Sequence, residues 1–260
     1  YWLELLYIKN IGILDTQMHD IYYYYNQCNY QSQQVVNMFD KLSTEFAEKL
    51  YNDICYTSKY KNALPSTIEK LSNISANVKN RQLVSHLNRT LLTTYVSNKH
   101  VDINIVKALV TESNLDFVDN YGNTPLHSYC TRGDSSDIEI IKLLKTYEIM
   151  KKSNEHKMIP LMIYLENHKY NVDDDVVLEL LNIENINMVD DQFKKSLDYY
   201  HRCNNQTDKV NNAYYALKEE YASIQLNHER EKTLLQNLHM QQYIDIPPKS
   251  KNSSSCCIIS

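Results

Sequence analysis

A unit of about 35 residues recurs along this chain, and the recurrence limits the fold more than any other feature of the sequence. The segment PLHSY at 125–129 aligns with PLMIY at 160–164, and TLLTTY at 90–95 aligns with TPLHSY one period later. Leu197 and Tyr200 continue the pattern about two periods after the first segment. Because such units bury their apolar faces only by stacking on their neighbours, the sequence predicts a repeat array.

Each unit also contains a second recurrent segment that begins with aspartate. The segments DINIVKALV (102–110), DIEIIKLLK (137–145) and DDDVVLELL (173–181) carry apolar residues at helical spacing, for example at Ile140 and Leu144. The chain has only three glycines and five prolines, fewer than the many sharp turns of an all-β fold require. We therefore predict an all-α fold in which each unit is a short helix, a polar connection and a second, amphipathic helix.

The best-preserved copy of the unit reads DNYGNTPLHSYC. Gly122 follows Asp-Asn-Tyr in a turn, where glycine takes a positive φ at little cost. Thr124 is placed to cap the next helix, and Pro125 at the first helical position gives up only an N–H that had no partner. We expect Leu126 to face the stack and His127 to bond back to the hydroxyl of Thr124. This assigns His127 a structural role.

The segment GNTPLHSYC resembles the ankyrin repeat, whose signature is T-P-L-H-x-A and whose period is about 33 residues. The long loops, and Tyr-Cys where alanine is usual, are most similar to the divergent ankyrin proteins of poxviruses. The resemblance implies an all-α ankyrin-repeat helical solenoid with flanking helices, which binds partners through its hairpin tips and concave face. It makes the loop with Asn120 and Tyr121 the candidate partner-binding loop. Lys157 and Phe193 stand where Gly122 would repeat, which irregular loops or terminal units tolerate.

We predict four segments along the chain. Residues 81–201 hold about three to four ankyrin repeats, of which the last is degenerate. Residues 1–80 show no clean copy, and form either a helical cap or decayed repeats that close the array, or a separate helical interaction domain. Residues 202–243 form a C-terminal helix, and residues 244–260 form a flexible tail with a C-a-a-X-like end.

The predicted C-terminal helix carries an apolar stripe with 4-3-4-3 spacing, at Val210, Tyr214, Leu217, Tyr221 and Ile224. His228 and Glu231 interrupt the stripe before it resumes at Leu235. Two clean heptads are fewer than a coiled coil requires, so we expect this helix to dock on the end of the array. Self-association through a short coiled coil is the alternative, and the oligomeric state stays open.

The tail ends in Cys257-Ile258-Ile259-Ser260, which fits the C-a-a-X pattern with the serine that specifies farnesyl transfer. Cys256 offers a site for palmitate, the second signal that stable membrane anchoring requires. Two prolines and a run of serines place both thiols on an accessible tail. The motif has this meaning only if Ser260 is the natural carboxyl terminus.

Neither composition nor motifs favour catalysis, a metal site, a cofactor or nucleic-acid binding. The net charge of −5 provides no basic field for a nucleic acid. The six cysteines include no CxxC pair, which favours reduced thiols in the cytoplasm. Histidines form no ligand spacing, and the three aspartates at 173–175 complement a helix dipole.

These observations predict a noncatalytic ankyrin-repeat adaptor that binds another protein in the cytoplasm. The poxvirus resemblance implies a host protein as the partner, and a role in host range or in evasion of host innate immunity. The alternative is a cellular scaffold that a farnesyl group on Cys257 anchors to a membrane surface.

Overall fold

The structure is a computed structural model that describes residues 13–14, 19–28, 32–58, 65–80, 87–133 and 136–244. The regular secondary structure of these residues is helical, and β contacts occur only as isolated bridges, such as those between Ile13 and Ile74 and between Val189 and Lys195. The all-α repeat solenoid predicted from the sequence is confirmed. Its central part consists of four helix pairs, α6 (Leu91–Val96) with α7 (Ile103–Leu109), α8 (Pro125–Cys130) with α9 (Ile138–Leu144), α11 (Pro160–Asn167) with α12 (Asp174–Leu180), and α13 (Ser196–Tyr200) with α14 (Asp208–Ile244).

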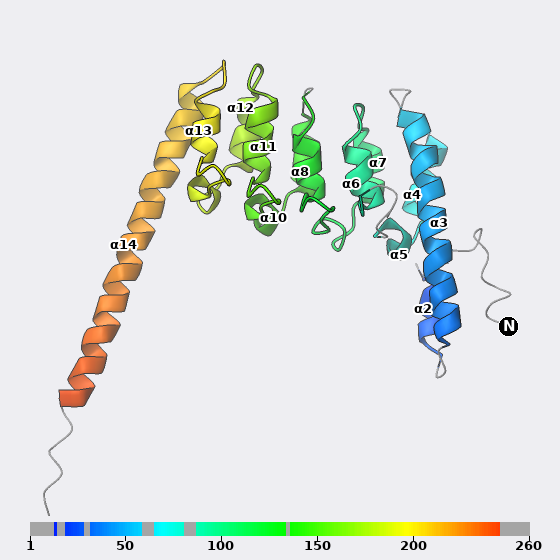
Figure 1. Cartoon of the computed structure of the whole chain (residues 1–260), viewed down its shortest axis with the longest axis horizontal. Helices are drawn as coiled ribbons and strands as arrows, with labels where there is room; N and C mark the ends of the chain where they lie inside the picture. Colours follow the sequence, from blue (N-terminus) through cyan, green and yellow to red (C-terminus); the bar gives the residue numbers. More distant parts are fainter. Residues whose placement is uncertain are drawn as a thin grey trace, which may run out of the picture.

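The pairs stack so that equivalent helices lie side by side (Figure 1). The first helices form one row, in which α6 contacts α8, α8 contacts α11 and α11 contacts α13. The second helices form another, in which α7 contacts α9, α9 contacts α12 and α12 contacts α14. Leu126, Leu161 and Ile141 lie between the rows and are almost fully buried. The apolar periodicity of the sequence therefore builds one continuous core, with each pair completed by its neighbours.

A buried tyrosine at the end of each first helix holds the start of the second helix. The tyrosine hydroxyl accepts a hydrogen bond from the backbone N–H that precedes the second helix, over 2.7 to 2.9 Å in the four pairs. These tyrosines are at most 1% exposed and lie 34, 35 and 36 residues apart, at Tyr95, Tyr129, Tyr164 and Tyr200. Burial raises the pKa of Tyr129 and Tyr164, so both stay protonated hydroxyls. The sequence alignment contained these tyrosines but did not indicate their role.

The aspartate that opens each recurrent second segment is the N-cap of the second helix. The carboxylates of Asp102, Asp137 and Asp173 accept from the backbone N–H two residues later at 2.8 to 2.9 Å. In the last pair Thr207 precedes α14, and its hydroxyl donates to Asp174 at 2.7 Å. Aspartate at this position satisfies an N–H that has no partner within the helix, which explains why it recurs.

The hairpins between pairs all contain a residue in the left-handed conformation. Gly122 has φ = 75°, and the aligned positions 157 and 193 hold Lys157 at 57° and Phe193 at 62°. One unit earlier, Asn88 has φ = 59°. The loss of glycine therefore did not change the turn, although a side chain in this region costs about 1–2 kcal/mol. Neighbouring hydrogen bonds, described below, determine the backbone path.

A further pattern appears before residue 81, where the sequence shows no clean repeat. The hydroxyl of Tyr25 in α2 (Ile21–Asn26) accepts from the N–H of Ser32, just before α3 (Gln33–Ser58), as in the four later pairs. The helix α3 then contacts α6, and α4 (Pro65–Ser72) contacts α7. By these contacts α3 extends the row of first helices and α4 extends the row of second helices, although α3 follows a tyrosine bond that precedes second helices in the later pairs. The short α5 (Ala76–Lys79) packs against α3.

One unit carries an extra helix that the sequence analysis did not predict. In two units a buried asparagine, Asn114 or Asn185, donates from its amide to the last carbonyl of the second helix at 2.8 Å. Asn185 lies in the short 3-10 helix η2 (Asn185–Asn187). Between these units, the aligned position holds Ile149, which is fully buried in α10 (Tyr147–Lys151). A packed isoleucine in a short helix replaces the polar contact there.

The last helix, α14, leaves the solenoid after its first turns. Val210 and Tyr214 are buried against the end of the array, and Lys209 pairs with Asp175 of α12 at 2.6 Å. The rest of the 37-residue helix runs away from the repeats (Figure 1). The start of α14 thus packs on the end of the array, and its remainder has no neighbour among the described residues. Self-association through a short coiled coil stays a prediction.

We predict that Gly122→Ala lowers the free energy of unfolding by about 1–2 kcal/mol. The new Cβ would take a positive φ and would lie 3.2 Å from both Asn154 Cα and Glu155 N. Gly133→Ala is the matched control, because its Cβ would meet only Asn167 O at 3.9 Å. Chemical denaturation of both variants measures the difference. Equal losses in the two variants would contradict this account of the hairpin.

Candidate protein-binding surface

The hairpin tips are joined into one continuous edge by backbone hydrogen bonds. Asn120 N donates to Leu87 O at 3.1 Å, and Glu155 N donates to Tyr121 O at 3.0 Å. Asp191 N donates in turn to His156 O at 3.1 Å. Each tip is therefore held in register with the one before it, so the edge is a connected surface and not a set of separate loops.

A polar side chain at the start of each hairpin fixes its shape. Asp119 Oδ1 accepts from the N–H groups two and four residues later, at 3.0 and 2.9 Å. Asn154 and Asp190 make the same pair of bonds at 2.8 to 3.1 Å. The residue between the two donors, three positions after the accepting side chain, lies at the turn. This position holds Gly122, Lys157 and Phe193, which all have a positive φ. The side chain at the first position therefore maintains the turn when glycine is absent.

Side-chain contacts between hairpins reinforce the same edge. Arg89 Nε lies 2.9 Å from Asp119 Oδ2, an ion pair whose carboxylate is buried. Asn154 Nδ2 donates to Asn123 Oδ1 at 3.0 Å, and Asn88 Nδ2 donates to Asn120 Oδ1 at 2.7 Å. The candidate loop residue Asn120 is thus exposed and already engaged by the preceding hairpin. Because the edge is preorganised, a partner that binds there loses little conformational entropy.

Two aromatic side chains project from this edge. Tyr121, part of the loop predicted from the sequence, is 44% exposed, and Phe193 at the tip of the last hairpin is 86% exposed. Phenylalanine is unfavourable there twice over, because it exposes an apolar ring and occupies a left-handed backbone position. The sequence analysis treated Phe193 only as a lost glycine. Its alignment with Gly122 was the signal that placed it at a tip.

His127, by contrast, lies inside the repeat. Its Nδ1 is 2.7 Å from Thr124 Oγ1 and accepts from Thr124 N at 3.2 Å, while Nε2 is 3.2 Å from Met158 O in the next hairpin. The ring is fully buried, and burial lowers its pKa to about 4. With Pro125 at the first helical position, Thr124 and His127 form a capping box at the start of α8. The neutral imidazole therefore links two units.

Cys130 and Cys203 are buried, and burial raises the pKa of both thiols, that of Cys203 to about 11. Neither is a thiolate at neutral pH, so neither is an activated nucleophile. No cluster of three or more metal-ligating side chains occurs within the described ranges. The lipidation candidates Cys256 and Cys257 lie outside the described residues.

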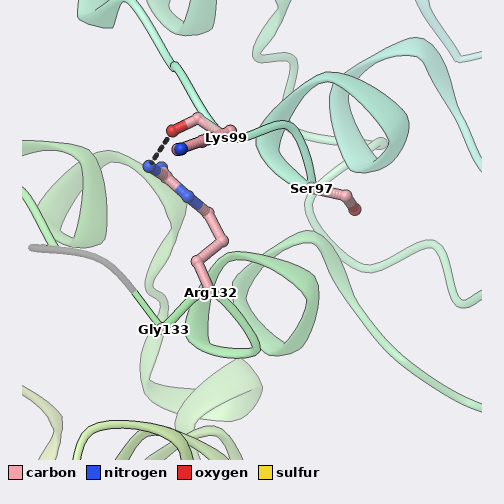
Figure 2. Close-up of a pocket in the computed structure, with 4 residues that line it drawn as sticks. All are labelled: Ser97, Lys99, Arg132 and Gly133. Atoms are coloured by element: carbon pink, nitrogen blue, oxygen red, sulfur yellow. Dashed lines mark hydrogen bonds between the residues drawn. The ribbon is translucent and has the colours of Figure 1, made fainter.

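The opposite edge of the solenoid carries a small pocket between the loops that follow α6 and α8, lined by Ser97, Lys99, Arg132 and Gly133 (Figure 2). Arg132 Nη2 donates to Lys99 O at 2.8 Å, and the guanidinium lies 4.9 Å from the Tyr129 ring centre. The arginine thus ties two neighbouring units together. The four described lining residues include no carboxylate, histidine or thiol that could act as a base or a nucleophile.

Comparison with known protein families supports this description. Residues 54–155 match the family model of ankyrin repeats (3 copies). This part of the chain contains ankyrin repeats. Such repeats generally mediate binding to other proteins. The match ends before α11. In the two later pairs the hydroxyls of Tyr164 and Tyr200 still accept from the N–H before the second helix, as Tyr95 and Tyr129 do in the matched pairs.

No curated protein matches the chain. The similarity to poxvirus ankyrin proteins therefore stays a prediction. Among the described helices, none has the length and the apolar character needed to span a bilayer.

We predict that His127 makes stability depend on pH. Its folded pKa of about 4 lies below the unfolded value of about 6.5, so the unfolded chain binds more protons between these values. The contribution of the neutral His127 to the free energy of unfolding is therefore fully present above pH ~6.5. It decreases as the pH falls, by about 2 kcal/mol between pH ~7 and ~5. Denaturant unfolding at both pH values measures this.

His127→Gln is the control for this prediction, because its amide does not titrate. The variant should lose this part of the pH dependence even if it is less stable at both pH values. If the variant and the parent protein show the same pH dependence, another group is responsible.

Proposed function

We propose that this protein is a noncatalytic adaptor that binds a partner protein along its hairpin edge. The observation that carries the proposal is the exposure of Phe193 and Tyr121 on a row of tips that hydrogen bonds hold rigid. Large aromatic side chains at fixed positions are the residues that most often dominate the energy of protein interfaces. The ankyrin repeats support the same role.

The tips also restrict the chemistry of the partner. Glu155 and Asp191 stand beside the aromatic residues, and His156 lies 3.5 and 3.8 Å from their respective carboxylates. Lys157 occupies the tip between them and is exposed, so the edge carries both signs of charge. This combination suits a partner surface with an apolar pocket and a polar rim of mixed charge. We further propose that the partner is a host protein and that the adaptor acts in the cytoplasm in host range or immune evasion. This finer proposal rests on the similarity of GNTPLHSYC and the long loops to poxvirus ankyrin proteins.

The proposal predicts that Tyr121→Ala combined with Phe193→Gly weakens partner binding about tenfold or more. Glycine at position 193 removes the ring and suits the positive φ, so the variant should fold at least as well as the parent. Affinity capture from cytosolic extract, quantified for each recovered protein, identifies the partner. Titration of the purified partner then gives the dissociation constants.

Tyr170→Ala is the matched control, since Tyr170 is 72% exposed but lies in the loop that joins α11 to α12. Figure 1 shows that loop along the upper edge of the solenoid, away from the hairpins. If Tyr170→Ala weakens binding as much as the double variant does, the hairpin edge is not the contact surface.

The alternative function is a scaffold held at a membrane surface through Cys257, and the Cys-Ile-Ile-Ser sequence is the observation that favours it. It depends on Ser260 being the natural carboxyl terminus. Cys257→Ser should then move the protein from the membrane fraction to the cytosolic fraction of cells. Cys256→Ser should cause a smaller shift, because a farnesyl group would remain. Identical cytosolic distributions of the parent and both variants would exclude the tether.

A further inference from the structure

The distal part of α14 exposes an apolar stripe that nothing in the described part of the chain covers. After Tyr221, which is half-buried, every described side chain as far as residue 236 is exposed. Ile224, Leu234 and Leu235 are 39%, 64% and 58% exposed. Figure 1 shows this part of the helix running away from the repeats. An unsupported helix of this length is only marginally stable in water, so a partner along the stripe would stabilise it.

The stripe has the geometry of a coiled-coil seam. It continues the 4-3 spacing of the docked residues Tyr214 and Tyr221 through Ile224, position 228, position 231 and Leu235. Leu234 lies next to this seam and widens its apolar surface. Leu226 is 49% exposed but lies on the other side of the helix, two residues after Ile224. The exposed part of the seam is therefore a defined face of the helix, which runs from Ile224 to Leu235 and spans under two heptads.

The two polar residues that interrupt the seam, His228 and Glu231, can pair with each other across two antiparallel copies of the helix. His228 and Glu231 lie at equal distances from the midpoint between residues 229 and 230, and Ile224 and Leu235 lie at equal distances from the same midpoint. A second helix that runs in the opposite direction about this point would place His228 against Glu231 of the second copy. It would also place Ile224 against Leu235 of the second copy. An imidazole N–H can donate to a carboxylate whether or not the ring is protonated.

We propose that a second copy of this chain packs antiparallel on the distal part of α14, with the two-fold axis between residues 229 and 230. Charge complementarity selects this occupant and this direction. A parallel pair would place Glu231 against the same carboxylate of the second copy, which is unfavourable. Within one helix His228 Nδ1 already lies 3.9 Å from Glu231 Oε2. The antiparallel pair adds two His228–Glu231 contacts between the copies, with apolar contacts on either side. The repeats would then extend from opposite ends of the paired helices, which gives a bivalent adaptor.

Sedimentation equilibrium of the full-length chain tests this proposal. The expected result is a mass that rises with concentration to that of a dimer. Leu235→Glu should weaken the dimer at least tenfold, because it buries a carboxylate against Ile224. Leu226→Glu is the matched control and should leave the dissociation constant unchanged. A monomer up to millimolar concentration, or equal effects of the two variants, would overturn the proposal.

The direction of the two helices is tested separately. A spin label introduced as an unnatural amino acid at exposed Lys218 should give a label-to-label distance of about 35 Å in the antiparallel dimer, because each residue adds about 1.5 Å along a helix. A parallel pair would bring the labels about 10–15 Å apart, roughly the spacing of packed helices plus the label arms. His228→Lys should preserve the antiparallel dimer, since lysine also pairs with Glu231. A short label distance, or a tenfold weaker dimer with His228→Lys, would overturn the antiparallel pairing.

Discussion

The hydrogen bond between a buried tyrosine hydroxyl and the backbone N–H at the start of the next helix is the contact on which the solenoid depends. It recurs in all four helix pairs, and Tyr25 makes the same bond before α3. The ring fills the core between neighbouring units while its hydroxyl satisfies a polar group of the loop. One side chain thus links the packing of a unit to the direction of its second helix.

At the hairpin edge, side chains that accept backbone hydrogen bonds determine the chain direction. Asp119, Asn154 and Asp190 each accept two backbone N–H bonds, and these bonds maintain the hairpin whether or not glycine is present. Backbone bonds between successive tips then align the hairpins. This arrangement frees the tip position for other residues. A side chain as large as Phe193 can therefore be displayed for binding at a modest cost in stability.

The candidate functional residues lie at the surface, and the histidine and aspartates that the sequence singled out have structural roles. His127 joins Thr124 to Met158 of the next unit, and the aspartates at 173–175 cap α12 and hold the start of α14. Packing and helix capping thus account for the histidine and the aspartates that could otherwise be taken for catalytic or metal-binding residues. The two surfaces that we propose for partners are the hairpin edge and the distal part of α14. Figure 1 shows the distal part of α14 running away from the repeats, so one surface could bind a partner while the other carried a second copy.

The sequence by itself determined the period, the helical character and the order of the units. It did so because apolar spacing, capping aspartates and the Thr124-Pro125 start are local signals, readable without knowledge of the neighbours. Tertiary structure decided the rest. The helices α3 and α4 join the helix rows through contacts that a degenerate sequence does not reveal. Phe193 becomes a projecting ring only because its hairpin keeps a left-handed turn. The 4-3 spacing of the α14 stripe continues past its polar interruption at His228 and Glu231, but only stacking determines that Tyr214 is buried and Leu235 is exposed. Burial depends on where the array ends, which is a property of the assembled stack and not of the helix.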